Sequence, residues 1–334
     1  MKKKDFMKKL LYFMKDYKKE SVLAPLFKML EAFFELFVPL VVASIIDDGI
    51  VPKDSEHIIR MCLLLLVLAA VGLTCSITAQ YFAAKAATGF ATELRHSLFE
   101  HIGTFSFTEI DDIGTARLIT RMTSDVNSVQ SCVNMVLRLF LRSPFIVFGA
   151  MIMAFTIDVK CALIFCVAIP ALSVVVFSIM LISIPLFKKV QGGLDNILKI
   201  TRENLTGLSV VRAYNAESYQ EEKFENANEA LTGTNLFAQR TMAFMMPSIQ
   251  LVMSGLMLAI YWIGAILIND AGMSGKISLF SDMMVFSQYA IQVVMAFMML
   301  VMIFMILPRA SVAAKRINEV LDTEATIEDG DKNI

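Results

Sequence analysis

The sequence is poor in the residues that build metal sites and disulfide frameworks. It has three histidines, none in an HExxH-like arrangement, and its five cysteines show no CxxC spacing. The cysteines are Cys62, Cys75, Cys132, Cys161 and Cys166. We therefore expect no metal ligands and no disulfides. A cleavable signal peptide is not expected either, since the apolar run 10–14 is too short for its hydrophobic region.

The sequence also lacks a phosphate-binding loop. Such a loop needs Gly, four residues, and then Gly-Lys-Ser/Thr, whereas the stretch Gly272–Ile277 has the wrong spacing and no Ser or Thr after its lysine. We expect no catalytic residues, and the chain alone should not hydrolyse ATP.

Alternating strand patterns are absent, and charged residues are scarce at 18% of 334. Hydrophobic residues make up 57%, and the mean hydropathy is +0.64. A membrane-spanning helix needs about 20 mostly apolar residues, and its backbone must be hydrogen-bonded internally. The sequence therefore predicts an all-α polytopic membrane protein. The expected spans are 22–46, 58–82, 139–157, 159–187, 243–268 and 279–307.

Two polar excursions, 83–138 and 188–240, separate some of these spans. Each is on the order of 55 residues, whereas packed helices are usually joined by about 2–8 residues. Neither is rich in Pro, Gly and Ser. A helix rises about 1.5 Å per residue, so each excursion could project roughly 30–35 Å from the membrane and return. We interpret them as helical levers that reach a partner outside the bilayer.

Positive charge indicates the orientation. The excursions and the first nineteen residues are rich in Lys and Arg, whereas the turn after the first span carries Asp47 and Asp48. This bias places both excursions and both termini in the cytoplasm of a multi-pass plasma-membrane protein. Residues 1–19 are expected to form an interfacial helix. Its apolar positions recur at three- and four-residue steps, at Phe6, Leu10, Phe13, Met14 and Tyr17. A soluble positive tail is the alternative.

The excursions contain helical periodicity near their ends. In the first, one apolar face of a returning helix consists of Leu118, Met122, Val126, Val129 and Val133, preceded by a glycine suited to a tight turn. In the second, Gly207 precedes Leu208–Tyr214, and Phe224 and Leu231 continue an apolar face.

The chain resembles the six-helix transmembrane domain of ATP-binding-cassette (ABC) exporters over nearly its whole length. The stretch Gly114–Arg121 with Asp125 resembles the family's first intracellular loop. Glu203, Gly207, 211–214 and Glu217 resemble the second. Residues 316–322 resemble the end of the sixth helix, and Pro39 with Ile46-Asp47 resembles the close of the first span.

The resemblance implies that two such units pair, as a homodimer or a heterodimer. Short coupling helices at the excursion tips would dock on cytoplasmic nucleotide-binding domains that hold ATP and Mg. The implied domains are 20–322 for the transmembrane region and 323–334 for a linker. An ATPase domain should follow Glu328, so we expect a truncated chain or a separately encoded ATPase. The implied docking residues are Asp111, Asp112, Thr115, Leu118, Ser209, Arg212, Tyr214 and Asn215. The implied structural braces are Gly114, Arg121, Asp125, Glu203, Gly207 and Glu217.

Polar groups within the spans are candidates for the substrate pathway, because they are expensive to place in hydrocarbon. Glu31 and Arg142 lie at matched depth, because each is about 16 residues, or roughly 24 Å, below the outer turn at Asp47 or Asp158. Matched depth allows the two side chains to pair. Lys28 lies nearby, and snorkelling of these charges to the interface is the alternative. Methionines, 23 in all, suit a cavity for varied apolar molecules, although lipid-facing filler is the plainer interpretation. The candidates are Glu31, Glu35, Arg138, Arg142, Gln250, Gln288, Gln292 and Met295.

The function expected from the resemblance is ATP-driven export of a hydrophobic or amphipathic drug, lipid or peptide. The chain itself would bind no cofactor and no nucleic acid. A secondary transporter is one alternative, although its links between spans are typically short. A non-transporting membrane receptor or scaffold is the other.

Overall fold

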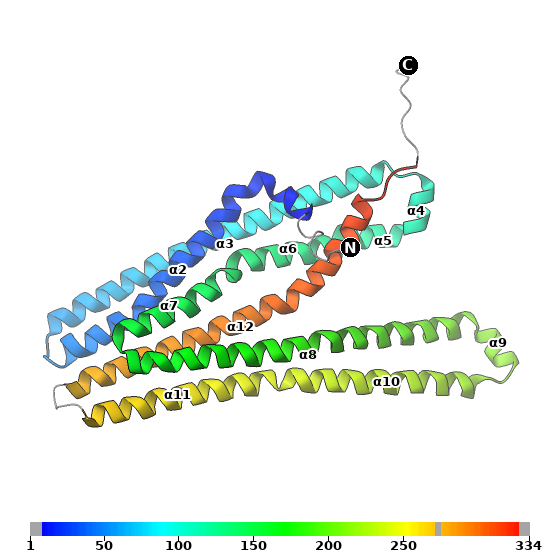
Figure 1. Ribbon diagram of the computed structural model, residues 1–334. Coiled ribbons are helices and arrows are strands. Elements are labelled where there is room, and N and C mark those ends of the chain that lie inside the picture. The colour runs from blue at the N-terminus through cyan, green and yellow to red at the C-terminus, as the bar shows by residue number, and fades with distance from the viewer. Residues whose placement is uncertain (1–8, 271–274, 327–334) are drawn as a thin grey trace, which may run out of the picture. The chain divides into compact units, whose positions relative to one another are not determined.

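The computed structural model describes residues 9–270 and 275–326, and in these ranges every regular element is helical (Figure 1). Six of the described helical segments are long and apolar enough to cross a membrane, which confirms the predicted all-α polytopic fold. They are Tyr12–Ile50, Ser55–Gly103, Thr115–Ile157, Val159–Thr206, Glu217–Asn269 and Gly275–Leu321.

The chain forms two units. The first combines Met1–Ala162 with Ile260–Ile334, and the second is Leu163–Ala259. The boundaries fall inside two continuous helices, α8 (Val159–Thr206) and α11 (Met245–Asp270).

The first unit is built around α3 (Ser55–Gly103). Asp54 starts this helix, because its side chain accepts hydrogen bonds from the backbone N–H groups of Glu56 and His57 at 3.0 and 3.1 Å. At about 1.5 Å per residue its 49 residues span roughly 74 Å, more than twice the ~30 Å hydrocarbon core. A large part of α3 therefore projects beyond any bilayer it crosses. The helices around it are α2 (Lys18–Ser44), α6 (Val126–Met135), α7 (Arg142–Ile157) and α12 (Gly275–Leu321).

Two short helices cap the projecting end of the first unit. They are α4 (Phe107–Ile113) and α5 (Thr115–Thr120), and Figure 1 shows them where α3 turns back toward α6. Single π-helical turns, η3 (Arg121–Asp125) and η4 (Val136–Phe140), flank α6. A π turn adds a residue to the turn and rotates the side chains that follow, a change that hydrophobic periodicity does not reveal.

The core of this projecting part lies between α3, α5, α6 and α12. The predicted apolar face of the returning helix is confirmed: Val126, Val129 and Val133 are buried there with Leu118, and Met122 packs against them. Their partners include Phe90 and Leu94 from α3 and Ile317 from α12.

The described part of the N-terminal segment packs against the projecting core through one of its predicted apolar positions. Leu10 is buried in the same core, and a 3₁₀ helix, η1 (Leu11–Tyr17), places Phe13 and Met14 against it. Phe13, Met14 and Tyr17 are only partly buried, so the interfacial helix over residues 1–19 stays a prediction. Residues 1–8, which include Phe6, lie outside the described residues.

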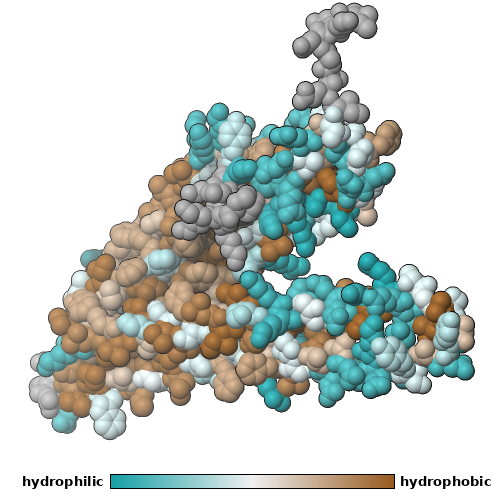
Figure 2. All heavy atoms as spheres, turned by 45° about the vertical axis from the view of Figure 1, so that its right-hand side comes forward, coloured by the Kyte–Doolittle hydropathy of each residue, from teal (hydrophilic) through white to brown (hydrophobic). Residues whose placement is uncertain are grey.

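The second unit is a helical rod pair with a short helix at its end. It contains most of α8, then α9 (Leu208–Ala213), α10 (Glu217–Ala243) and the first part of α11. The helices α8 and α10 lie side by side, since a Cβ on Gly193 would sit 3.0 Å from a Leu231 methyl carbon. Lys223 also pairs with Glu203 at 3.0 Å. Figure 2 shows hydrophilic residues gathered over the α4–α5 end of the first unit and along α10 in the second.

Candidate coupling tips and polar clusters

The tip of the first unit is the short helix α4. Its start is a capping box, in which the Ser106 N–H donates to Glu109 Oε2 at 2.7 Å and the Ser106 hydroxyl donates to the same carboxylate. Its end is Gly114, whose φ of 84° is a conformation that glycine adopts without steric cost. Asp111 and Asp112 are exposed on α4, and Thr115 is exposed just beyond it. The tip is thus a fixed turn that presents charged and polar side chains outward.

Glu109 also ties the tip to the chain that follows α12. Its Oε1 accepts hydrogen bonds from the Thr326 hydroxyl at 2.5 Å and from the Thr326 N–H at 3.3 Å. The hydroxyls of Ser106 and Thr326 hold the pKa of the Glu109 carboxyl at about 2, well below its usual range. Nearby, His101 Nε2 lies 2.9 Å from the Thr323 carbonyl oxygen. The α4 tip and the exit from α12 therefore form one connected structure.

Two ion pairs connect the π turn η3 to α12. Arg121 lies 3.7 Å from Glu319, and Arg316 lies 3.7 Å from Asp125. Both pairs join residues about 190–200 positions apart in the sequence. This geometry supports the bracing role expected for Arg121 and Asp125.

One docking expectation is corrected by burial. Leu118 is only 5% exposed and packs in the core, so its side chain is not available to a partner. Helical periodicity had already placed it on the apolar face, and the two expectations conflict. Phe107, by contrast, escaped the sequence analysis although it is 87% exposed at the start of α4. The signal was present: an aromatic residue directly follows a capping serine and precedes an acidic stretch.

The tip of the second unit is α9 and the turn after it. Gly207 precedes α9, and Asn215 has a φ of 50°, which reverses the chain toward α10. Ser209, Arg212 and Asn215 are exposed, and Tyr214 is 81% exposed. The structure therefore brings the four docking residues predicted for the second tip together on one exposed turn. Glu203 pairs with Lys223 and thereby joins the two rods behind the tip, while Glu217 is exposed in the first turn of α10.

The charged residues predicted within the spans pair with one another. Lys28 Nζ lies 2.5 Å from Glu31 and 3.1 Å from the Ser76 hydroxyl of α3. Arg142 lies 2.6 Å from Glu35 and 3.8 Å from Glu31. The side chains of Lys28, Glu31 and Arg142 are at most 15% exposed. Two positive and two negative charges thus form a neutral cluster that joins α2, α3 and α7.

The remaining predicted pathway residues are separate from this cluster. Gln288 is exposed and lines a cavity of about 310 Å³ with Tyr261 and Ser287, whereas Gln292 has a buried amide oxygen without a hydrogen-bond partner among the described residues. Met295 is 54% exposed on α12. Gln250 is exposed in the second unit. Within the first unit, the structure does not gather the predicted pathway residues into one site.

The fold and its two braced tips define a class: a polytopic helical membrane domain with projecting rods that end in exposed short helices. Sequence comparison identifies the family within this class. The family described as "ABC transporter transmembrane region" matches residues 21–297, and the chain belongs to this family.

Two relatives align with more of this chain than the family model does. An uncharacterized ABC transporter ATP-binding protein of Mycobacterium tuberculosis is 33% identical over 311 residues, which are 93% of this chain and 53% of that protein. One from Bacillus subtilis is 30% identical over 318 residues, 95% of this chain and 55% of that protein. An ATP-dependent lipid A-core flippase of Pseudomonas savastanoi is 25% identical over 219 residues, 66% of this chain and 36% of that protein. The chain spans about half the length of the first two.

Proposed function

We propose that this chain forms half of the membrane pathway of an ATP-driven exporter and that α4 and α9 couple it to ATP-binding domains. The observation that carries the proposal is the pair of exposed tips on braced rods, in a chain of the ABC transmembrane family. ATP and Mg would be bound by the ATP-binding domains rather than by residues 9–326. Family membership removes the secondary transporter as an alternative.

The tips have the chemistry of a docking surface. On the second tip, Tyr214 presents a large exposed ring two residues from the exposed Arg212. On the first tip, Phe107 presents an exposed ring on the same short helix as the exposed Asp111 and Asp112. Aromatic and Arg side chains dominate the binding energy of many protein interfaces. Helices and ion pairs behind each tip brace the chain that carries it, so a displacement of a docked domain would be transmitted along the rods.

The proposed assembly pairs two membrane units, with the tips and both termini in the cytoplasm as the positive-inside bias indicates. The substrate would be hydrophobic or amphipathic, and the lipid A-core flippase among the relatives makes a lipid one candidate class. Within the chain, Gln288, Gln292 and Met295 remain the proposed pathway residues. We assign the neutral cluster of Lys28, Glu31, Glu35 and Arg142 to helix attachment instead, because its charges compensate one another.

The docking proposal is tested by site-specific photo-crosslinking in the complete transporter. Benzoylphenylalanine introduced in place of Tyr214 should crosslink to an ATP-binding domain, identified by mass spectrometry. The matched control is the same replacement at Tyr219, which is 65% exposed on α10 behind the tip and should not crosslink to that domain. Equal crosslinking at both positions, or none at position 214, would contradict docking through α9.

The coupling proposal is tested by Tyr214→Ala in proteoliposomes. Loss of a central interface aromatic costs about 2 kcal/mol, so we expect docking roughly 30-fold weaker. ATP-dependent movement of ethidium or of a fluorescent phospholipid should fall with it, while Tyr219→Ala should retain both movement and ATPase activity. If neither probe moves in an ATP-dependent way and neither changes the ATPase rate, the receptor or scaffold alternative is favoured.

A further inference from the structure

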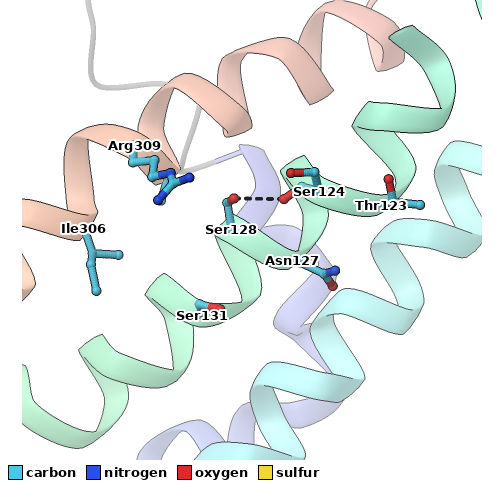
Figure 3. Close-up of a pocket in the computed structure, with 8 residues that line it drawn as sticks. Thr123, Ser124, Asn127, Ser128, Ser131, Ile306 and Arg309 are labelled. Atoms are coloured by element: carbon cyan, nitrogen blue, oxygen red, sulfur yellow. Dashed lines mark hydrogen bonds between the residues drawn. The ribbon is translucent and has the colours of Figure 1, made fainter. Parts of the chain in front are cut away.

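We propose that a cavity between α6 and α12 binds a phosphate group, carried by a lipid headgroup or a soluble ester. The cavity has a volume of about 550 Å³, within the range of small-molecule sites. Figure 3 shows polar side chains of η3 and α6 on one side and Ile306 with Arg309 of α12 on the other. The polar residues are Thr123, Ser124, Asn127, Ser128 and Ser131.

The lining is the outward face of an amphipathic helix. Ser124, Ser128 and Ser131 recur at four- and three-residue steps, while Val126, Val129 and Val133 occupy the core on the other side of α6. A second cavity of about 400 Å³ shares Ser131 and continues along the helix past Asn134 to Arg138. The lining of the two cavities contains two arginines and no carboxylate.

Both arginines lack the counter-ions that neighbouring basic residues have. Arg121, Arg316 and Arg142 each pair with a carboxylate. In the part of the chain that the structure describes, neither Arg309 nor Arg138 has a carboxylate within 4.0 Å. Arg309 is exposed in the first cavity, whereas Arg138 Nε, in the second cavity, is buried without a hydrogen-bond partner. An unpaired buried donor is costly, so an anionic acceptor in the second cavity would satisfy Arg138, and Arg309 adds a positive charge without a carboxylate partner in the adjoining first cavity.

The available donors favour an oxyanion with several acceptor oxygens. In Figure 3 the Arg309 guanidinium points toward Ser128 across the cavity. Arg95 of α3 donates to Asn127 Oδ1 at 2.6 Å, and in Figure 3 the Asn127 side chain lies on the side of α6 away from Arg309. The Ser128 hydroxyl is already committed to the Ser124 carbonyl oxygen at 2.8 Å. The Thr123 hydroxyl is committed in the same way to the Ile119 carbonyl oxygen, so the hydroxyls of Ser124 and Ser131 remain as donors beside the guanidinium. A guanidinium fork with hydroxyl donors suits a phosphate, which offers more acceptor oxygens than a carboxylate.

This binding site extends the proposed function without requiring that the bound molecule be exported. Binding can be measured on the purified full chain in detergent by native mass spectrometry and calorimetry, with no ATP present. Three probes separate the sources of the phosphate: dioctanoyl phosphatidic acid, dioctanoylglycerol as its phosphate-free counterpart, and glycerol 3-phosphate as a soluble ester.

We expect phosphatidic acid or glycerol 3-phosphate, or both, to bind more tightly than dioctanoylglycerol. Arg309→Gln should weaken that binding about tenfold or more, because a charge-assisted hydrogen bond is lost. Arg309→Lys should weaken it less, since the charge remains without the fork. Lys315→Gln is the matched control: it removes one exposed positive charge from the same helix outside the cavity and should change the affinity less than twofold.

Preferential binding of phosphatidic acid assigns the site to a lipid headgroup, and binding of glycerol 3-phosphate assigns it to a soluble ester. The proposal is overturned if no phosphate probe binds, if dioctanoylglycerol binds equally well, or if Arg309→Gln keeps wild-type affinity. Equal losses in Arg309→Gln and Lys315→Gln would also overturn it, because they would indicate general electrostatic attraction. These results do not depend on export, so failure here leaves the coupling tests above intact.

Discussion

The ion pair between Lys28 and Glu31 provides a sharp test of the energetics of the first unit. Their charged atoms are 2.5 Å apart, and the side chains are 7% and 15% exposed. Lys28→Met would leave the cluster with one excess negative charge, and Glu31→Leu with one excess positive charge. The double variant restores neutrality, because Arg142 and Glu35 remain paired at 2.6 Å.

The expected loss of unfolding free energy in each variant follows from the distances between the charged atoms. At an effective dielectric constant of about 20, the 2.5 Å pair gains roughly 7 kcal/mol and the 3.8 Å pair of Arg142 and Glu31 roughly 4 kcal/mol, before desolvation is subtracted. Removing one partner of a buried pair typically costs about 3–5 kcal/mol. Arg142 still compensates Glu31 when Lys28 is lost, so we expect about 3 kcal/mol for Lys28→Met and about 4 kcal/mol for Glu31→Leu.

The assay is a double-mutant cycle on the unfolding free energy in mixed detergent and SDS micelles. We expect the double variant to be more stable, by about 2 kcal/mol or more, than the sum of the single effects implies. The control is the cycle for Glu20 and Lys85, an ion pair of 3.0 Å between α2 and α3 that includes a lysine that is 48% exposed, whereas Lys28 and Glu31 both lie in α2. Its coupling should stay below about 1 kcal/mol. Additive effects at Lys28 and Glu31, or equal coupling in both cycles, would refute the reasoning.

Two further predictions concern the packing and the titration of the first unit. A Cβ on Gly89 would lie 2.2 Å from the Tyr17 ring, so Gly89→Ala should destabilise the domain by about 1–3 kcal/mol in the same unfolding assay. Gly72→Ala on the same helix meets nothing within 4 Å and should not destabilise it; equal losses would contradict the contact with Tyr17. The pKa of Glu109 falls from its usual 4.5 to about 2, so the stability it contributes is fully present above pH 4.5 and lost as the pH falls through 2. Hydrogen exchange at the Thr326 amide should therefore accelerate across this window in the wild type but not in Glu109→Gln, and identical pH profiles would disprove the link.

Hydropathy predicted most of the fold, because the bilayer requires long apolar helices and leaves few alternatives. The apolar face 118–133 was also predictable, since a 3.6-residue period is encoded locally. The π turns were not, because a single extra residue in a turn leaves no compositional trace. The contact between Glu109 and Thr326 joins positions 217 apart, and nothing in either local sequence indicates its partner.

The candidate site was predicted less completely for a related reason. The family resemblance predicted exposed tip residues such as Tyr214. For Leu118 the resemblance predicted docking on a partner, whereas helical periodicity predicted a buried side chain, and the packing shows that it is buried. Glu31 and Arg142 were expected at the same depth, and the structure adds that Lys28 and Glu35 neutralise them. Arg309 drew no attention in the sequence, because a lone arginine near the end of a helix is ordinary until its neighbours are known.

The side-by-side packing of α8 and α10 limits how this chain can change in length. Gly193 is matched to Leu231 and Glu203 to Lys223, so the two rods must stay in register along their whole length. Deleting one residue from α8 would turn everything beyond it by about 100° and retract it by about 1.5 Å, and α9 would face another direction. Substitutions along the exposed faces of the rods leave that register intact. Insertions and deletions should therefore be tolerated only in matched pairs, one in each rod, that restore the register between α8 and α10; each such pair still changes the reach of α9 by about 1.5 Å per residue.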